Sequence, residues 1–176
     1  MTDLSKRPAV IAANSLTLRA FEEADMQPLA DILKSPLVAR TYMLPDFPDN
    51  AAALALAERL RALSHDDARF VYGAFREGKL VGFLNSVKIW EEEIELGYVV
   101  APACWNQGIA TEMLTAAIGA LFGLGFTAVR AGYFEENPAS GRVMIKSGMH
   151  PLDETEIIPY RGRGHRCLLC RIERGG

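Results

Sequence analysis

The sequence predicts one domain of mixed α and β structure, with helices on both faces of a central mixed sheet. Its 176 residues suit a single compact unit. Stretches that alternate with period two are interspersed with stretches of helical period. They follow the order β-α-α-β-β-β-α-β-α-β-β, which is typical of a mixed sheet covered by helices. We expect the domain to span residues 1–176, with the weakly patterned residues 1–13 as a flexible N-terminal arm.

Composition argues against several classes of protein. Hydrophobic residues make up 49% of the chain and charged residues 23%, so general disorder is not expected. A formal net charge of -3 lacks the basic excess of a nucleic-acid-binding domain. No apolar run reaches the roughly 18 residues of a membrane span, and the N-terminus lacks the regions of a secretion signal. We therefore expect a cytoplasmic protein with no nucleic-acid or membrane partner.

The first half of the chain is predicted to contain one strand, two helices and a three-stranded meander. A helix begins at Asp25, which can act as its N-cap, and Ser35-Pro36 ends it. The loop at 40–49 is irregular, with two prolines and two aromatic residues. The expected strands are 16–21, 70–75, 80–84 and 94–100, and the expected helices are 25–34 and 49–63.

In the second half the period changes to helical after Pro102. A helix from Ile109 is apolar on most sides and is expected to pack against the sheet. A strand at 126–134 precedes a helix in which Asn137 is the N-cap and Pro138 the first helical residue. Two final strands, around 149–154 and 167–173, enclose an arginine-rich loop.

Three cysteines do not form a disulfide framework. Cys167 and Cys170 form a C-x-x-C near His165, but a structural zinc site needs about four ligands and no second pair exists. Positions i and i+3 of a strand point to opposite faces, so ordinary strand cysteines are the favoured interpretation and a metal or redox site the alternative. Cys104 is interpreted as a small apolar filler rather than a nucleophile, because no base is adjacent.

The junction between strand 94–100 and the following helix is the first candidate site. It reads Ala-Pro-Ala-Cys-Trp-Asn-Gln-Gly-Ile-Ala-Thr-Glu over residues 101–112. The first turn of a helix leaves backbone N–H groups unpaired, and their partial positive charge suits a phosphate. Gly108 and Ala110 leave the backbone open to close approach. A plain helix start is the alternative interpretation of this loop alone.

A second segment, Glu136 to Met149, lies one strand further on. Together the two segments resemble the GNAT superfamily of acyl-CoA-dependent N-acetyltransferases, and most of all its RimJ/RimL type, the ribosomal-protein-alanine acetyltransferase branch. The resemblance runs from about Leu16 to Ile172 and rests on matching residues at 16–19, 95–98, 105–112, 137, 140, 142–143, 146 and 148–149. It implies the acyl-CoA N-acyltransferase fold, an α+β (mixed α/β) arrangement with a central, mostly antiparallel sheet of six to seven strands.

The chain departs from the family pattern at three places. Trp105 stands where many relatives carry Gln or Arg, and an aromatic residue there is common in the RimJ/RimL branch. Gly148-Met149 replaces the frequent Gly-Phe. The tyrosine that many relatives use as an acid in the Asn137 helix has no counterpart, and Met144 occupies that neighbourhood.

The resemblance implies acetyl-CoA as co-substrate and no metal. Val99 and Val100 would offer backbone groups to the pantetheine arm, and amides of residues 107–111 would hold the pyrophosphate. Asn137 would contact the pantetheine and also cap its helix. Lys146 is a further candidate toward the cofactor's phosphate, with a solvated surface as the alternative. The candidate cofactor-binding residues are Val99, Val100, Trp105, Asn106, Gln107, Gly108, Ile109, Ala110, Thr111, Asn137 and Lys146.

The expected reaction is direct attack of a neutral primary amine on the acetyl thioester. Glu95 is the candidate base, acting directly or through a water, because partial burial in its strand would raise its pKa. A salt-bridged or solvent-facing glutamate is the alternative. Ser140 is the candidate acid or thiolate stabiliser by its position in the RimJ/RimL type, and a helix-supporting polar residue is the alternative. The oxyanion donor is expected to be a backbone N–H near Val99 and Val100.

The amine acceptor is expected to be a protein N-terminus or a small amine. Its pocket is predicted to form from Tyr42, Phe47 and Trp90, with Tyr160 as an additional candidate. Two other functions stay open from the sequence: a non-catalytic acyl-CoA-binding sensor on the same fold, and a nucleotide-binding regulatory domain. The oligomeric state is expected to be a monomer or a homodimer.

Overall fold

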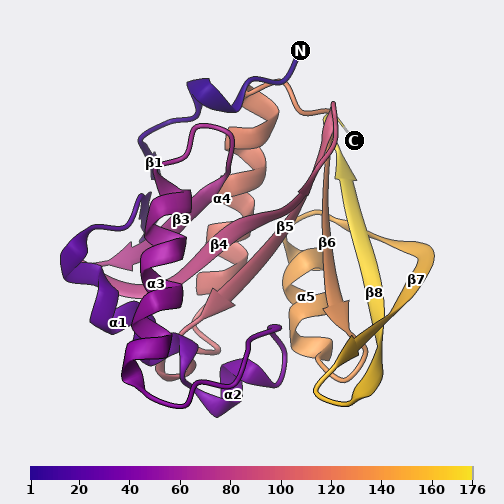
Figure 1. Ribbon diagram of the computed structural model, residues 1–176. Helices are drawn as coiled ribbons and strands as arrows, with labels where there is room; N and C mark the ends of the chain where they lie inside the picture. The colour runs from indigo at the N-terminus through magenta and orange to yellow at the C-terminus, as the bar shows by residue number, and fades with distance from the viewer. Residues whose placement is uncertain (176) are drawn as a thin grey trace.

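An eight-stranded sheet in the order β1-β2-β3-β4-β5-β6-β8-β7 forms the centre of the molecule (Figure 1). The computed structural model describes residues 1–175, and Gly176, the last residue of the expected domain, lies outside them. Adjacent strands are antiparallel except β5 and β6, which are parallel. The strands are β1 (Val10–Ala12), β2 (Thr17–Arg19), β3 (Val71–Arg76), β4 (Lys79–Ile89), β5 (Glu93–Val100), β6 (Ala128–Phe134), β7 (His150–Tyr160) and β8 (Arg163–Glu173).

Helices cover both faces of this sheet, as expected from the sequence. They are α1 (Met26–Leu33), α2 (Pro36–Ala39), α3 (Asn50–Ser64), α4 (Ile109–Gly123) and α5 (Pro138–Lys146). One buried cluster joins α4 and α5 to the sheet, and a second joins α1 and α3 to the opposite face. The alternation within β5 assigns its side chains to these clusters, because Leu96 belongs to the first and Val99 to the second.

The strand count exceeds the expected six to seven because of the N-terminal segment. Residues 10–12, expected in the flexible arm, form β1 and pair with β2. The carbonyl of Pro8 also accepts a 2.5 Å hydrogen bond from the hydroxyl of Tyr72. Further along, Glu112 of α4 accepts hydrogen bonds from the Ser15 hydroxyl at 2.7 Å and the Leu16 N–H at 3.1 Å. Residues 10–12 of the expected arm are therefore held to the domain by backbone pairing, and Pro8 by a side-chain hydrogen bond.

Other elements also differ from the prediction. Strand β4 runs to Ile89 instead of ending at 84. Pro36 was expected only to end a helix, but it occupies the first turn of the short helix α2, a position that proline favours. The expected arginine-rich loop is the tight turn of a long β7–β8 hairpin, with Arg161 and Gly162 in left-handed conformations. The side chains of β7 are mostly exposed at the sheet edge, so their pattern carries little hydrophobic signal.

Cys167 and Cys170 lie on opposite faces of β8, as the spacing predicts. Cys167 packs in a small cluster with Phe134 and Leu169, whereas Cys170 belongs to the core beneath α4 and α5. Both are buried free thiols, and burial raises the pKa of Cys167 to about 11. Within residues 1–175, no cluster of three or more His, Cys, Asp or Glu side chains is placed to hold a metal ion. None of the helices in this part of the chain has the length and apolar character that crossing a membrane requires.

Candidate active site

The chain turns sharply at the start of α4. Asn106 and Gly108 both adopt left-handed backbone conformations, with φ of 60° and 75°. Glycine takes this conformation with little strain, which suits Gly108 to the N-cap position. The N–H of Glu112 donates to the carbonyl of Gly108 at 3.0 Å, so the amides of residues 109–111 precede the first helical hydrogen bond. Together with the helix dipole, these amides give this end of α4 a partial positive charge.

Strands β5 and β6 pair over only part of their length. Residues 93–96 of β5 pair with residues 128–131 of β6, and beyond them the strands diverge toward their C-terminal ends (Figure 1). We call the divergent part, residues 97–100 and 132–134, the fork. Here the two strands no longer pair with each other, although β5 still pairs with β4 and β6 with β8. The fork is therefore the place where a ligand can pair with the backbone of β5 on the side that faces β6.

A cavity of about 470 Å³ joins the start of α4 to this fork. On one face of the sheet it is bounded by α4 and α5, and on the other by Val38, Thr41 and Tyr42, which lie in and just after α2. The cavity therefore passes through the sheet at the fork. Its lining includes Gly97, Tyr98, Val99, Val100, Trp105, Asn106, Gly108, Ile109, Ala110, Thr111, Gly132, Tyr133, Asn137, Ser140, Arg142 and Lys146.

The backbone groups of β5 alternate in direction along the fork. The N–H of Ala101 donates to the carbonyl of Val81 in β4 at 2.8 Å. Because hydrogen-bonded pairs alternate along an antiparallel ladder, Val99 also directs its backbone toward β4, whereas Tyr98 and Val100 direct theirs toward the fork. The indole N–H of Trp105 donates to the carbonyl of Val100 at 2.8 Å, which leaves the N–H of Val100 as the group facing the fork.

Ser140 is held at the first turn of α5 by a tyrosine from β5. Its hydroxyl lies 2.7 Å from the hydroxyl of Tyr98, and the Tyr98 hydroxyl lies 3.1 Å from the Ser140 carbonyl. Both residues line the cavity. The Ser140 side chain thus contacts β5 at the edge of the cavity.

Glu95 is half-buried on β5, two residues before Gly97 and on the same face of the strand. Burial raises the pKa of its carboxyl group. Neighbouring charges act in both directions, since Lys88 and Arg130 favour the carboxylate while Glu156 and Glu93 disfavour it. Glu95 does not line the cavity itself; its Cα is about 7 Å along the strand from Gly97, which does.

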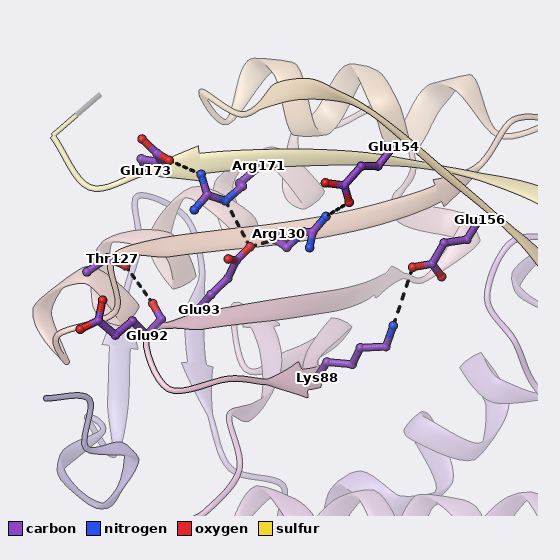
Figure 2. Close-up of polar contacts among 9 residues, drawn as sticks. All are labelled: Lys88, Glu92, Glu93, Thr127, Arg130, Glu154, Glu156, Arg171 and Glu173. Atoms are coloured by element: carbon purple, nitrogen blue, oxygen red, sulfur yellow. Dashed lines mark hydrogen bonds and ion pairs between the residues drawn. The ribbon is translucent and has the colours of Figure 1, made fainter.

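Ion pairs connect charged side chains of neighbouring strands on this face of the sheet (Figure 2), and four of these side chains, Lys88, Glu93, Arg130 and Glu156, act on the Glu95 carboxyl group. Arg130 of β6, which pairs in register with Glu95, contacts Glu93 at 3.3 Å and Glu154 at 2.7 Å. Lys88 of β4 and Glu156 of β7 approach to 3.9 Å, although three strands separate β4 from β7 in the sheet. Strand β7 must therefore curl over this face, so that charged side chains from four strands enclose the carboxylate of Glu95.

Comparison with known proteins shows the family to which the chain belongs. The family model of the acetyltransferase (GNAT) domain matches residues 15–150. The chain belongs to the GNAT acetyltransferase family. This membership confirms the resemblance seen in the sequence, the expected fold, and the expected enzyme class, an acetyltransferase that uses acetyl-CoA as acetyl donor.

The individual relatives share only low sequence identity with this chain. The chain is 24% identical over 144 residues to YoaA, an uncharacterized N-acetyltransferase of Bacillus subtilis (strain 168), covering 79% of this chain and 81% of YoaA. A GNAT-family acetyltransferase from Bacillus anthracis has a TM-score of 0.80 at 21% identity, covering 93% of this chain and 98% of that one. RimL, a ribosomal L7/L12 alpha-N-protein acetyltransferase in complex with coenzyme A, has a TM-score of 0.79 at 17% identity, covering 93% and 97%. The two structural likenesses concern the fold.

The structure gathers most of the residues that the GNAT resemblance assigned to the cofactor. Ten of the eleven candidates line the cavity, and Gln107 is the exception. The Gln107 side chain points outward and accepts a 2.8 Å hydrogen bond from Arg76. Asn137 is the N-cap residue of α5 and Pro138 its first helical residue, as expected, but the Asn137 side chain makes no capping hydrogen bond. Its amide side chain is therefore available to the cavity.

The residues predicted to form the amine acceptor pocket lie far apart in the structure. Tyr42 lines the cavity, donates a 2.8 Å hydrogen bond to Asn85, and has its pKa raised to about 12 by burial. Phe47 lines a second cavity, of about 570 Å³, beside α1 and α2. Trp90 lies at the opposite end of β5 from Val99, with Arg130 5.9 Å from its ring centre, and lines neither cavity.

Sequence reasoning missed two tyrosine contacts. Nothing in the sequence shows that Ser140 reaches the hydroxyl of Tyr98, which lies 42 residues earlier in the chain. Tyr160 was expected as a wall of the acceptor pocket. Its hydroxyl instead donates to the carbonyl of Ala39 at 2.6 Å and accepts from the N–H of Leu44 at 3.2 Å, which binds the α2 loop to the β7–β8 hairpin.

Proposed function

We propose that this acetyltransferase transfers the acetyl group of acetyl-CoA to a primary amine, with Glu95 as the general base and Ser140 as the group that stabilises the leaving thiolate. The observation that carries the proposal is the cavity that passes through the sheet at the fork. A donor bound from the α4 face and an amine bound from the α2 face meet there without crossing any other element.

The cavity suits acetyl-CoA at both ends. The amides of residues 109–111 and the left-handed Gly108 form an anion-binding end, and the side chains of Arg142 and Lys146 add positive charge to the lining. Toward the fork, the backbone of Tyr98 and Val100 offers hydrogen-bonding groups to a linear amide such as pantetheine. When bound, acetyl-CoA supplies the activated acetyl thioester.

Glu95 accepts the proton that the attacking amine must lose. Its raised pKa brings the carboxylate closer in basicity to the working pH, which makes proton transfer more favourable than to an exposed glutamate. Since its Cα is about 7 Å from that of Gly97, a bridging water completes the path to an amine in the fork. The N–H of Val100 faces the fork and donates to the oxygen that gains negative charge.

Ser140 acts at the other side of the reacting carbon. The bond between carbon and sulfur breaks with its electron pair going to sulfur, and the Ser140 hydroxyl donates a hydrogen bond to that thiolate. The proton taken by Glu95 passes to solvent, and the thiolate takes one from solvent, so that the products are an amide and free coenzyme A.

The acceptor class is a protein N-terminus or a small amine. RimL, by its name, acetylates the α-amino group of a ribosomal protein, so N-terminal peptides come first in an acceptor screen. The screen also contains polyamines, amino acids and aminoglycosides, and free thiol release is measured with acetyl-CoA. Turnover with at least one amine, reduced in both Glu95→Gln and Ser140→Ala, supports the proposal.

Two results count against it. Tight acetyl-CoA binding without turnover of any amine favours the non-catalytic sensor. Turnover that neither substitution changes removes both catalytic assignments while leaving the acetyltransferase function in place.

A further inference from the structure

The contact between Tyr98 and Ser140 joins the two elements that bound the cavity. Tyr98 follows Ile94 and Leu96 on one face of β5, but those two side chains are fully packed in the core, whereas Tyr98 lines the cavity and reaches the first turn of α5. Its hydroxyl lies 2.7 Å from the Ser140 Oγ and 3.1 Å from the Ser140 carbonyl. The tyrosine hydroxyl therefore has two partners on one residue and only one proton to give.

Counting protons leaves two arrangements. If Tyr98 donates to the carbonyl, the Ser140 hydroxyl donates to Tyr98 and its proton is already engaged in that bond. If Tyr98 donates to the Ser140 Oγ, the serine proton is free to point into the cavity. Only the second arrangement lets Ser140 donate a hydrogen bond to a leaving group.

We propose that Tyr98 is a positioning residue for the reaction: it donates its hydroxyl proton to the Ser140 Oγ and thereby directs the serine proton toward the leaving thiolate. This inference rests on the proposed function. A thiolate in the cavity selects the arrangement by itself, because a serine that donates to sulfur can no longer donate to Tyr98. The donated bond also polarises the serine hydroxyl, which strengthens its hydrogen bond to the thiolate.

Tyr98 does not serve as the acid itself. Burial raises the pKa of its hydroxyl well above the ordinary value, since a phenolate would be poorly solvated there. The tyrosine therefore remains neutral throughout and acts only through Ser140. It differs in position from the tyrosine that many relatives carry in the helix corresponding to α5, because it comes from β5.

The test is a double-mutant cycle with Tyr98→Phe, Ser140→Ala and the double variant, assayed with the best amine from the acceptor screen. Tyr98→Phe removes one hydroxyl and keeps the ring. We expect kcat to fall on the order of 10-fold in Tyr98→Phe, with KM for acetyl-CoA changed less than twofold. In the Ser140→Ala background, Tyr98→Phe has almost no further effect on kcat, because the serine hydroxyl that Tyr98 positions is absent.

Tyr72→Phe is the matched control. Tyr72 is fully buried, and its hydroxyl donates to the backbone carbonyl of Pro8, outside the cavity. The Tyr72→Phe variant also loses one hydrogen bond of a tyrosine hydroxyl, so we expect it to lower the melting temperature without lowering kcat. A similar melting temperature for Tyr98→Phe and Tyr72→Phe shows that lost folding stability does not explain the kinetic effect.

The possible outcomes distinguish a failure of the Tyr98 positioning role from a failure of the proposed function. An unchanged kcat in Tyr98→Phe, or an equal loss in the presence and absence of the Ser140 hydroxyl, overturns the positioning role alone. A wild-type enzyme that acetylates none of the amines overturns the proposed function, and the positioning role with it.

Discussion

The hydroxyl of Tyr160 donates a 2.6 Å hydrogen bond to the carbonyl of Ala39, 121 residues earlier in the chain. Arg161 strengthens the same junction, because its guanidinium pairs with Asp46 and its Nε donates to the Tyr160 hydroxyl at 2.8 Å. The β7–β8 turn is thus fastened across the loop that carries Tyr42 into the cavity. The shape of the cavity on the α2 face depends on contacts that no local sequence pattern reveals.

Removing this junction is expected to affect the acceptor more than the donor. Tyr160→Phe leaves the Ala39 carbonyl and the Leu44 N–H without this partner and should lower the free energy of unfolding by about 1–2 kcal/mol. We expect KM for the amine to rise severalfold while KM for acetyl-CoA stays constant, measured by steady-state kinetics. An equal rise in both constants would show that the whole cavity has changed and not only its α2 face.

The start of α4 gives a prediction with a built-in control. Gly108→Ala places a Cβ on a left-handed residue, which costs about 1–2 kcal/mol, and disturbs the anion-binding amides. Gly78, in the β3–β4 turn, has nearly the same φ of 77° and likewise has open space at its Cβ position. Calorimetric titration should show about 10-fold weaker acetyl-CoA binding in Gly108→Ala and unchanged binding in Gly78→Ala. Equal affinities in the two variants would remove α4 from the proposed phosphate site.

Glu95 should control the acid side of the pH profile. Burial raises its pKa above the ordinary 4.5, so the carboxylate, and with it kcat, should be lost as pH falls through that raised value. Glu95→Gln is expected to lower kcat about 100-fold or more and to remove this limb from the profile. Glu92→Gln, at an exposed turn position, is the control and should retain both. A pH limb that survives in Glu95→Gln would assign the titration to another group.

The same raised pKa has a consequence for stability. A carboxyl whose pKa is higher in the folded state than in the unfolded state stabilises the fold while protonated, and that contribution is lost as pH rises through the folded value. At a pH above that folded value, the ionised Glu95 therefore opposes folding. Thermal unfolding at pH 7 should show a higher melting temperature for Glu95→Gln than for the wild type, together with its lower activity. A lower melting temperature would indicate that the ion pairs around Glu95 outweigh its burial.

Glu136 is expected to behave in the opposite way. A hydrogen bond from its own backbone, followed by bonds with His165 and Arg163, lowers the pKa of its carboxyl to about 2. Its stabilising contribution is present above about pH 4.5 and is lost as pH falls toward 2. Melting temperatures measured across this range should fall less steeply for Glu136→Gln than for the wild type. Parallel curves would contradict the assignment.

The sequence predicts those parts of the fold that have a hydrophobic period. Strands β3 and β5 and the helices α3, α4 and α5 appear close to their expected bounds, because their apolar residues follow a clear period. Strand β4 begins as expected but continues to Ile89, where its side chains are exposed. Strand β1 is missed because its three residues are too few to show alternation, and only its pairing with β2 makes it a strand. The length of β7 is missed because an exposed edge strand has no core face to mark it.

In the candidate site too, features with a local sequence pattern could be predicted and the others could not. Contiguous features, such as the α4 start around Gly108, could be predicted because one loop carries them. Contacts between distant segments could not, since the pairing of Tyr98 with Ser140 depends on how α5 packs against the sheet. Trp90 illustrates the converse: it looked suited to the acceptor pocket, but strand direction carries it to the far end of β5.

The fork between β5 and β6 also determines how the two reactants can enter. The cavity is lined from both sides of the sheet, so in the proposed function the donor and the acceptor enter from opposite sides and neither must leave before the other arrives. The proposal therefore requires both to be present together, with no acetylated form of the protein between them. Initial rates measured while both substrate concentrations vary should give intersecting lines in double-reciprocal plots. A ping-pong mechanism, in which coenzyme A leaves before the amine binds, would give parallel lines.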